Sequence, residues 1–243
     1  MSEGNVALVT GGATGIGAEI CRHMLAAGYE VVVLDRRRPD WTDARLQVHE
    51  VDLLDAGAVA DIARDVAARH SVTHLVHNAG AIRPASIADS RLEDLQALTQ
   101  LHIGAGLTLA QALLPAMQEK RFGRIVLMSS RGALGLANRT AYAATKAGIV
   151  GVVRSWSLEL APHGITVNAI APGPIGGTEM FRGVIPVGDP REQTLAASIP
   201  VKRLGRPDDV ARAVMFFADR ANDFVTGQTL YVCGGTSVGS LPI

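Results

Sequence analysis

The feature that most constrains this chain is a glycine-rich turn that joins a predicted strand to a predicted helix near the N-terminus. The run Asn5–Thr10 is rich in valine and leucine, and a stretch with helical spacing follows residues 11–17. Glycines permit positive φ angles and let a backbone approach a ligand closely, while a helix N-terminus offers unpaired N–H groups to a pyrophosphate. The spacing is G-x-x-x-G-x-G, unlike the general dinucleotide fingerprint, but the strand-to-helix context is the one that fingerprint requires. We therefore predict a dinucleotide-binding turn whose contacts come from Gly11, Thr14, Gly15, Ile16 and Gly17.

Apolar runs of strand length alternate with helical stretches along the rest of the chain. The further predicted strands are Glu30–Asp35, Leu46–Val51, His74–His77, Arg124–Met128, Ile165–Ile170 and Leu230–Cys233. Their connections contain amphipathic stretches such as Ala56–Arg69 and Tyr142–Leu160. Such alternation predicts right-handed crossovers and a parallel sheet covered on both faces. The expected fold class is α/β: a single Rossmann-like, doubly wound domain over residues 1–243, with an irregular substrate-side flap at residues 173–204.

Composition limits the partners and the compartment. The 23 basic residues balance 23 acidic ones, so no overall field recruits nucleic acid or an anionic membrane. No basic and apolar leader precedes the first strand, so we expect no signal peptide and a cytoplasmic protein. Leu95–Gln118 lacks charged residues, but polar side chains interrupt it, which favours a buried core helix, or two in series, over a membrane span. Cys21 and Cys233 are expected to be reduced, buried thiols.

Three side chains indicate proton-transfer chemistry. Tyr142 and Lys146 are four residues apart in a helical stretch, so they share one face and the ammonium can favour the phenolate. Ser130 ends an apolar run twelve residues before Tyr142. A phenol that titrates near about 10 becomes a usable base only with such help.

Taken in chain order, these motifs resemble those of the short-chain dehydrogenase/reductase family in its common form of about this length. The matching segments are Thr10–Gly17, Asn78-Ala79-Gly80, Ser130, Tyr142-x-x-x-Lys146, Asn168 and Pro172-Gly173. The resemblance implies an oxidoreductase that passes a hydride between a nicotinamide cofactor and a secondary alcohol or ketone. One alternative is a 3-oxoacyl carrier-protein reductase, for which Lys120 and Arg121 resemble a carrier-binding patch. A non-catalytic NAD-binding sensor or scaffold is an alternative of another class.

The resemblance also implies roles for the three side chains. Tyr142 would be the general acid/base, and Lys146 would lower the pKa of Tyr142 and bond the nicotinamide ribose. Ser130 would hold the substrate oxygen where negative charge develops. Ser129 competes for that role, but strand alternation from Ile125 and the family's Ser-Ser pattern favour Ser130.

Three histidines are candidates for catalysis or for metal binding. His102 stands where the family places an asparagine that positions a water of a proton relay. Its imidazole would hold that water or relay protons itself near neutral pH; the alternative is a buried histidine hydrogen-bonded to the backbone in a kinked helix. His74 and His77 are three residues apart on a strand and face opposite sides, and no Cys/His/Asp cluster has ligand spacing. We therefore predict no metal.

Asp35 determines the expected cofactor. It ends the second strand about twenty residues beyond the glycine turn, where a carboxylate accepts hydrogen bonds from ribose hydroxyls and repels a 2′-phosphate. We expect NAD rather than NADP, although Arg36 can stack on adenine or hold a phosphate. The run Arg36–Arg38 as a whole is interpreted as a solvated loop. The resemblance implies further cofactor contacts from Asp52, Leu53, Asn78, Ala79, Gly80, Tyr142, Lys146, Pro172, Gly173, Ile175 and Thr178.

Two expectations concern partners. A small-molecule alcohol or ketone is the expected substrate, with a pocket lining that fits cyclic alcohols, hydroxyacyl thioesters and aromatic alcohols alike. The residues expected to approach it are Arg83, Arg131, Leu136, Met180 and Phe181. The uncharged stretch Leu95–Gln118 carries more apolar surface than one sheet face covers, and small residues lie on a neighbouring helix, which predicts a homotetramer. Those small residues are Ala143, Ala147, Gly148 and Gly151.

Overall fold

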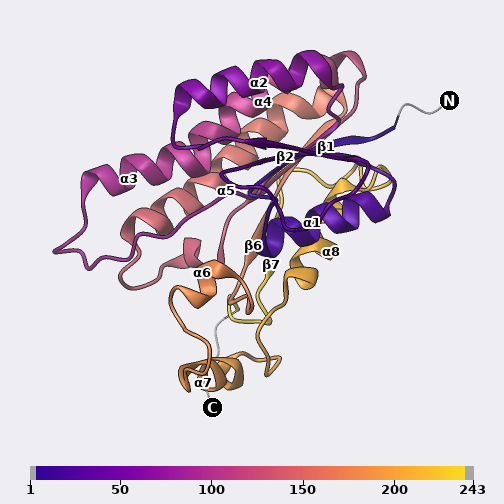
Figure 1. Cartoon of the computed structure of the whole chain (residues 1–243). Coiled ribbons are helices and arrows are strands. Elements are labelled where there is room, and N and C mark those ends of the chain that lie inside the picture. The colour runs from indigo at the N-terminus through magenta and orange to yellow at the C-terminus, as the bar shows by residue number, and fades with distance from the viewer. Residues whose placement is uncertain (1–3, 239–243) are drawn as a thin grey trace.

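The computed structural model describes residues 4–238, which build one seven-stranded sheet with helices on both faces (Figure 1). The strands are β1 (Val6–Thr10), β2 (Glu30–Asp35), β3 (Leu46–Glu50), β4 (His74–His77), β5 (Gly123–Met128), β6 (Ile165–Pro172) and β7 (Thr229–Val232). All neighbours pair in parallel, in the order β3-β2-β1-β4-β5-β6-β7. The strand order reverses between β1 and β4, and open α/β sheets bind ligands beyond the carboxyl ends of the strands at such a point. The predicted doubly wound parallel sheet is confirmed.

The two faces of the sheet carry separate cores. The covering helices are α2 (Ala56–Arg69), α4 (Ala105–Glu119) and α5 (Thr140–Leu160) on one face, and α1 (Gly15–Ala26) and α8 (Pro207–Ala218) on the other. Alternation along β1 sends Leu8 into the first core and Val9 into the second, and both are fully buried. Because both faces are covered, the strands carry near-continuous apolar runs. Two short 3-10 turns, η2 (Arg131–Leu134) and η3 (Ala161–His163), flank α5.

The uncharged stretch forms one helical rod with a wider turn in its middle. Helix α3 (Leu92–Thr99) continues through a π turn, η1 (Gln100–Gly104), into α4 without a break. By length and composition alone, Leu92–Glu119 could cross a membrane. Its side chains Leu109 and Met117 are nevertheless fully buried in the sheet core, as in a core helix. The π turn makes the predicted pair of helices continuous, and π turns of this kind are frequent at functional sites.

Residues 173–204 lie beyond the carboxyl ends of the strands and contain two short helices. They are α6 (Glu179–Arg182) and α7 (Arg191–Ser198). A double hydrogen bond joins them, from Arg182 to both carboxylate oxygens of Glu192 at 2.5 and 3.1 Å. A bridge from Ile175 to Gly205 ties the base of the segment to the chain that leads into α8.

Asn168, one of the residues behind the family resemblance, serves the fold. Its side-chain nitrogen donates to the carbonyl oxygen of Val225 at 2.8 Å, and its side-chain oxygen accepts from the backbone N–H of Gln228 at 3.0 Å. These bonds hold the segment that leads into β7 against β6.

Acid should destabilise this fold before its carboxylates titrate. Burial lowers the pKa of His74 and His77 to about 4 and that of His102 to about 2. Between the ordinary value of about 6.5 and these values, the unfolded chain binds protons that the folded chain does not, so the free energy of unfolding falls as pH falls. We expect a loss of about 1.4 kcal/mol per histidine for each pH unit below about 6.5.

Denaturant titrations between about pH 7 and about pH 5 would measure this slope. His74→Gln can still donate to the carbonyl of Ala218, which His74 bonds at 3.1 Å, and should remove about a third of the slope. A free energy of unfolding that stays level to about pH 5 would contradict the prediction.

Candidate active site

One cavity of about 890 Å³ opens beyond the carboxyl ends of β1, β4, β5 and β6. All the residues predicted to bind cofactor or to catalyse line it, except Gly17 and His102. They are Gly11, Thr14, Gly15, Ile16, Asp35, Asp52, Leu53, Asn78, Ala79, Gly80, Ser130, Tyr142, Lys146, Pro172, Gly173, Ile175 and Thr178. Segments far apart in the sequence therefore meet at the predicted crevice.

The glycine turn adopts a shape that only glycine permits at several positions. Gly11 and Gly15 have φ angles of 64° and 56°, in the left-handed region. A Cβ on Gly17 would lie 1.9 Å from the carbonyl oxygen of Gly11, so this residue shapes the turn without reaching the cavity. Thr14 is the N-cap of α1 but its side chain does not cap the helix, which leaves N–H groups of the first turn for an anion. These features fit the pyrophosphate of a dinucleotide.

Polar side chains at the ends of β2 and β4 hold this turn in place. One carboxylate oxygen of Asp35 accepts the N–H of Ala13 at 3.0 Å. Asn78 donates from its side-chain nitrogen to the carbonyl oxygens of Thr10 and Gly11, at 3.2 and 2.9 Å. Asp35 thus both supports the turn and lines the cavity, and its other oxygen accepts the N–H of Arg37 at 3.4 Å.

Asp52 and Thr178 also cap local structure. Asp52 accepts the N–H of Leu54 at 3.0 Å after β3. Thr178 is the N-cap of α6 and accepts the N–H of Phe181 at 3.2 Å. Despite the extra residue at Gly176-Gly177, Thr178 lines the cavity.

Ser130 and Tyr142 form a hydrogen-bonded pair in the cavity. Ser130 caps the turn η2, with its Oγ accepting the N–H of Gly132 at 3.0 Å, and it also bonds the Tyr142 hydroxyl. Burial raises the pKa of Tyr142, and the Ser130 bond opposes that rise. Ser129 points elsewhere, because its buried Oγ donates to the backbone oxygen of Lys146 at 2.7 Å. The geometry therefore favours Ser130 over Ser129 as the substrate-facing serine.

The contacts and the charge state of Lys146 differ from those expected. Its Nζ donates to the carbonyl oxygen of Met128 at 2.7 Å and lies 5.7 Å from the ring centroid of Tyr142, over the ring rather than at the hydroxyl. Only 4% of Lys146 is exposed, and this burial lowers its pKa to about 7. The predicted lowering of the Tyr142 pKa is absent from this arrangement, because burial of the phenol dominates.

His102 projects inward from the π turn, with both ring nitrogens in hydrogen bonds. Its Nε2 accepts the N–H of Ala81 at 3.2 Å, so Nδ1 carries the proton and donates to Thr145 Oγ1 at 2.8 Å. Burial and the nearby Lys146 ammonium lower the pKa of His102 to about 2. The structure therefore contradicts the expectation that His102 titrates near neutral pH. Its ring packs edge-on to Tyr142, with centroids 5.8 Å apart, which makes it a support for that side chain.

The substrate end of the cavity has the mixed lining expected from the sequence. Arg83, Arg131, Leu136, Met180 and Phe181 all line it. Arg83 pairs with Asp94 at 2.6 Å, whereas Leu136 and Met180 are 48% and 39% exposed. Apolar side chains and basic groups thus lie together at this end of the cavity.

Sequence reasoning missed the position of Arg37. The run Arg36–Arg38 was interpreted as a solvated loop, and Arg38 does pair with Glu50 on the exposed surface. Arg36 and Arg37, however, both line the cavity, and Arg37 bonds Thr14 and Glu179.

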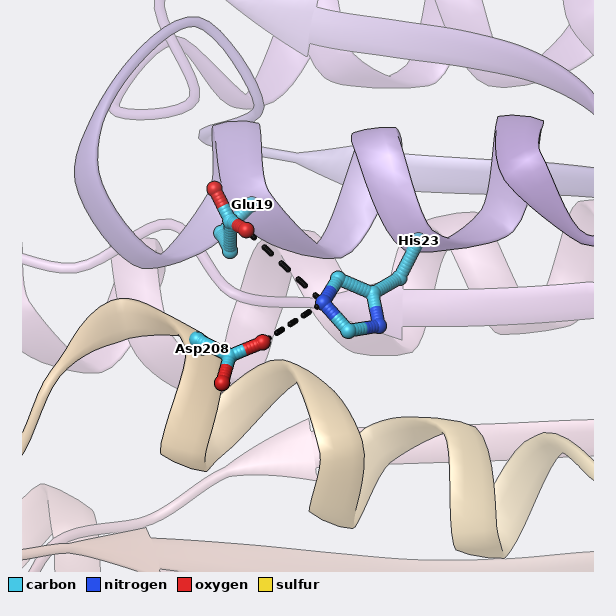
Figure 2. A group of neighbouring side chains, drawn as sticks. All are labelled: Glu19, His23 and Asp208. Carbon is cyan, nitrogen blue, oxygen red and sulfur yellow. Dashed lines mark hydrogen bonds and ion pairs between the residues drawn. The ribbon is translucent and has the colours of Figure 1, made fainter.

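A second cluster that the sequence did not reveal lies on the seam between α1 and α8. Figure 2 shows the ring of His23 between two carboxylates, with Nε2 at 2.9 Å from Asp208 and 3.7 Å from Glu19. These groups lie close enough to hold a metal ion. Arg22 and Arg212 already pair with the other carboxylate oxygens, and none of the three residues lines the catalytic cavity. We interpret the cluster as an ion-pair network between helices, and the absence of a catalytic metal stays a prediction.

The site and the fold agree with what comparisons with known proteins found. The family model described as enoyl-(acyl carrier protein) reductase matches residues 11–237. The chain belongs to the short-chain dehydrogenase/reductase family. This short-chain dehydrogenase/reductase is 39% identical over 240 residues to the acetoacetyl-CoA reductase of Rhizobium meliloti, covering 95% of this chain and 97% of that one.

Two other similar proteins are named for different substrates. One is the BbsD subunit of a hydroxy(phenyl)methylsuccinyl-CoA dehydrogenase from Thauera aromatica, 36% identical over 252 residues, with 97% and 98% of the two chains covered. The other is a provisionally assigned NAD(P)-dependent gluconate 5-dehydrogenase from Beutenbergia cavernae, solved with NADP at low occupancy. It has a TM-score of 0.88 and 31% identity, and 98% of each chain is covered. The present protein is thus an oxidoreductase of CH–OH and keto groups that uses a nicotinamide dinucleotide.

Proposed function

We propose that this short-chain dehydrogenase/reductase uses NAD(H) to interconvert a small secondary alcohol and its ketone at Ser130, Tyr142 and Lys146. The observation that carries the proposal is the placement of Ser130, Tyr142 and Lys146 in the same cavity as the glycine turn. A bound nicotinamide supplies or accepts the hydride. Ser130 holds the substrate oxygen, and Tyr142, kept protonated by burial, gives its proton to that oxygen when a ketone is reduced.

Lys146 makes the reverse proton transfer possible. In the oxidising direction Tyr142 must take the proton of the substrate hydroxyl, which requires its phenolate. Burial keeps the pKa of Tyr142 raised overall, and a protonated Lys146 beside the ring offsets part of that penalty when the anion forms. The pKa of Lys146, about 7, leaves it partly charged at neutral pH. Ribose hydroxyls of a bound cofactor are the further partners that we assign to this ammonium.

Cofactor choice is tested by calorimetry. Because the Asp35 carboxylate faces the cavity, we expect NADH to bind more tightly than NADPH. Asp35→Asn keeps an oxygen for the Ala13 N–H but removes the charge, so it should narrow the gap by roughly tenfold. Tighter binding of NADPH by the parent protein would overturn the assignment of NAD(H). The test is needed because the similar structure from Beutenbergia cavernae was solved with NADP.

A second candidate is a reductase of 3-oxoacyl thioesters, including those on a carrier protein. The chain is similar to an acetoacetyl-CoA reductase, and the basic groups Arg83 and Arg131 line the cavity. Both observations favour a thioester substrate that carries negative charge. Lys120 and Arg121 do not support it as expected, because they precede β5 while Ser130 follows it. The length of β5 separates Lys120 and Arg121 from Ser130 by roughly 20 Å.

Turnover assays separate these functions. NADH consumption should be followed with acetoacetyl-CoA, and with cyclic and aromatic ketones; NAD reduction should be followed with the matching alcohols. We expect turnover of at least one class, and a preference for the thioester would select the second candidate. Binding of NADH without turnover of any substrate would instead favour the non-catalytic sensor.

We also propose a cytoplasmic homotetramer. The exposed side of α5 carries Ala147, Gly148 and Gly151, and Leu158 on the same helix is 80% exposed. Small residues of this kind let helices of two subunits approach closely. Cys21 and Cys233 are free and buried, as suits a reducing compartment. Light scattering should give the mass of four chains, and a monomer at micromolar concentrations would refute the assembly.

A further inference from the structure

Arg37 joins the flap to the glycine turn at the adenosine end of the cavity. Its Nη2 donates to Thr14 Oγ1 at 3.1 Å and to Glu179 Oε1 at 2.5 Å. Thr14 occupies the N-cap position of α1 without capping it through its side chain, whereas Glu179 is the first residue of α6 in the flap. One guanidinium therefore bridges two segments that are far apart in the chain.

A second contact shows that the flap rests on the turn itself. A Cβ on Gly15 would lie 3.4 Å from the Cγ2 of Thr178, the N-cap of α6. The start of α6 is thus held against the turn that we assign to the pyrophosphate. Opening this end of the flap requires the Arg37–Glu179 contact to break.

Arg37 also stands where a 2′-phosphate would arrive. It lies two residues after Asp35, the carboxylate assigned to the adenosine ribose, and its N–H approaches Asp35 Oδ1 at 3.4 Å. The hydrogen bond with Glu179 raises the pKa of Arg37, so the guanidinium stays charged. Guanidinium groups bind phosphates as well as carboxylates, and Glu179 holds Arg37 through a single nitrogen, Nη2. A 2′-phosphate that draws the guanidinium toward itself therefore competes with Glu179.

We propose that Glu179 is a cofactor-specificity residue, which occupies Arg37 as a 2′-phosphate would. NADP(H) must displace Glu179 from Arg37 and loosen the flap, whereas NAD(H) leaves the contact intact. This inference rests on the proposed NAD(H) use of the cavity. By this proposal the flap contributes to the discrimination between cofactors with and without a 2′-phosphate on the adenosine ribose.

The expected change in cofactor preference is small because Arg37 and Glu179 are exposed to solvent. The side chains of Arg37 and Glu179 are 50% and 66% exposed, so solvent screens the pair. Exposed ion pairs change an equilibrium constant by at most about fivefold. The effect should also shrink as salt is added.

The test compares two flap variants that lose the same charge. Glu179→Gln removes the negative charge that faces Arg37, whereas Glu192→Gln removes the negative charge that faces Arg182 on the same flap. Calorimetry at low salt should show NADPH binding about three- to fivefold more tightly to Glu179→Gln, with no tightening of NADH. Glu192→Gln should leave the ratio of the two dissociation constants unchanged. An unchanged ratio in Glu179→Gln, or an equal change in both variants, overturns the proposal.

A double variant shows whether Arg37 carries the effect. In an Arg37→Gln background, Glu179→Gln should no longer alter the ratio; an alteration there would also overturn the proposal. The outcome is separable from that of the proposed function. A parent that prefers NADPH contradicts NAD(H) use but still permits the shift in Glu179→Gln, whereas a parent that prefers NADH with no shift contradicts this inference alone.

Discussion

Replacing Tyr142 by phenylalanine should lower kcat by at least roughly a hundredfold while NADH still binds. The ring is 9% exposed and packs edge-on to His102, so phenylalanine preserves the packing. Only the hydroxyl that bonds Ser130 is lost, and with it the proton given to the substrate oxygen. Steady-state kinetics and calorimetry on the same preparation measure the two effects.

Ser130→Ala is the matched comparison for this variant. It removes the bond to the Tyr142 hydroxyl but leaves the phenol, so it should lower kcat by less than Tyr142→Phe does. Near-normal turnover in Tyr142→Phe would remove Tyr142 from the mechanism.

Lys146→Met should abolish most activity without weakening the fold. The ammonium is buried and its pKa is lowered to about 7, which means that its charge is costly in the folded protein. Below about pH 7 the lysine is protonated both folded and unfolded, so an apolar side chain of similar length should give an equal or larger free energy of unfolding there. We expect kcat/KM to fall by at least roughly a hundredfold, because Tyr142 loses the positive charge that favours its anion.

Two measurements separate a chemical from a structural role for Lys146. Denaturant titration should show no loss of stability in Lys146→Met, while kinetics show the loss of activity. A large drop in the free energy of unfolding would indicate that the lysine, through its bond to Met128, mainly holds the fold.

Local signals predicted the fold and the membership of the site. Each strand is an apolar run bounded by turn residues, and Glu30–Asp35 and His74–His77 are strands with the predicted limits. The strand-to-helix context placed the glycine turn, and helical spacing put Tyr142 and Lys146 on one face of α5. These features depend on residues close together in the sequence, so no tertiary contact had to be known.

The states of the site residues depend on distant neighbours, which the sequence pattern does not reveal. The pKa of His102 is lowered by burial and by Lys146, which lies on another helix. Lys146 is directed at the carbonyl of Met128 because β5 passes beneath α5, and spacing within one helix carries no sign of this. The contact of Arg37 with Glu179 likewise exists only because the flap folds back onto the glycine turn.

Isotope transfer tests the central claim most directly. NADH carrying deuterium at both hydrogen positions of C4 should be incubated with the best ketone substrate, and the product analysed by mass spectrometry and NMR. Hydride transfer in the Ser130–Tyr142–Lys146 site predicts an alcohol with one deuterium on its carbinol carbon, formed by the parent protein and strongly reduced in Tyr142→Phe. Product without deuterium at that carbon, or equal labelling by the parent and Tyr142→Phe, would contradict the account.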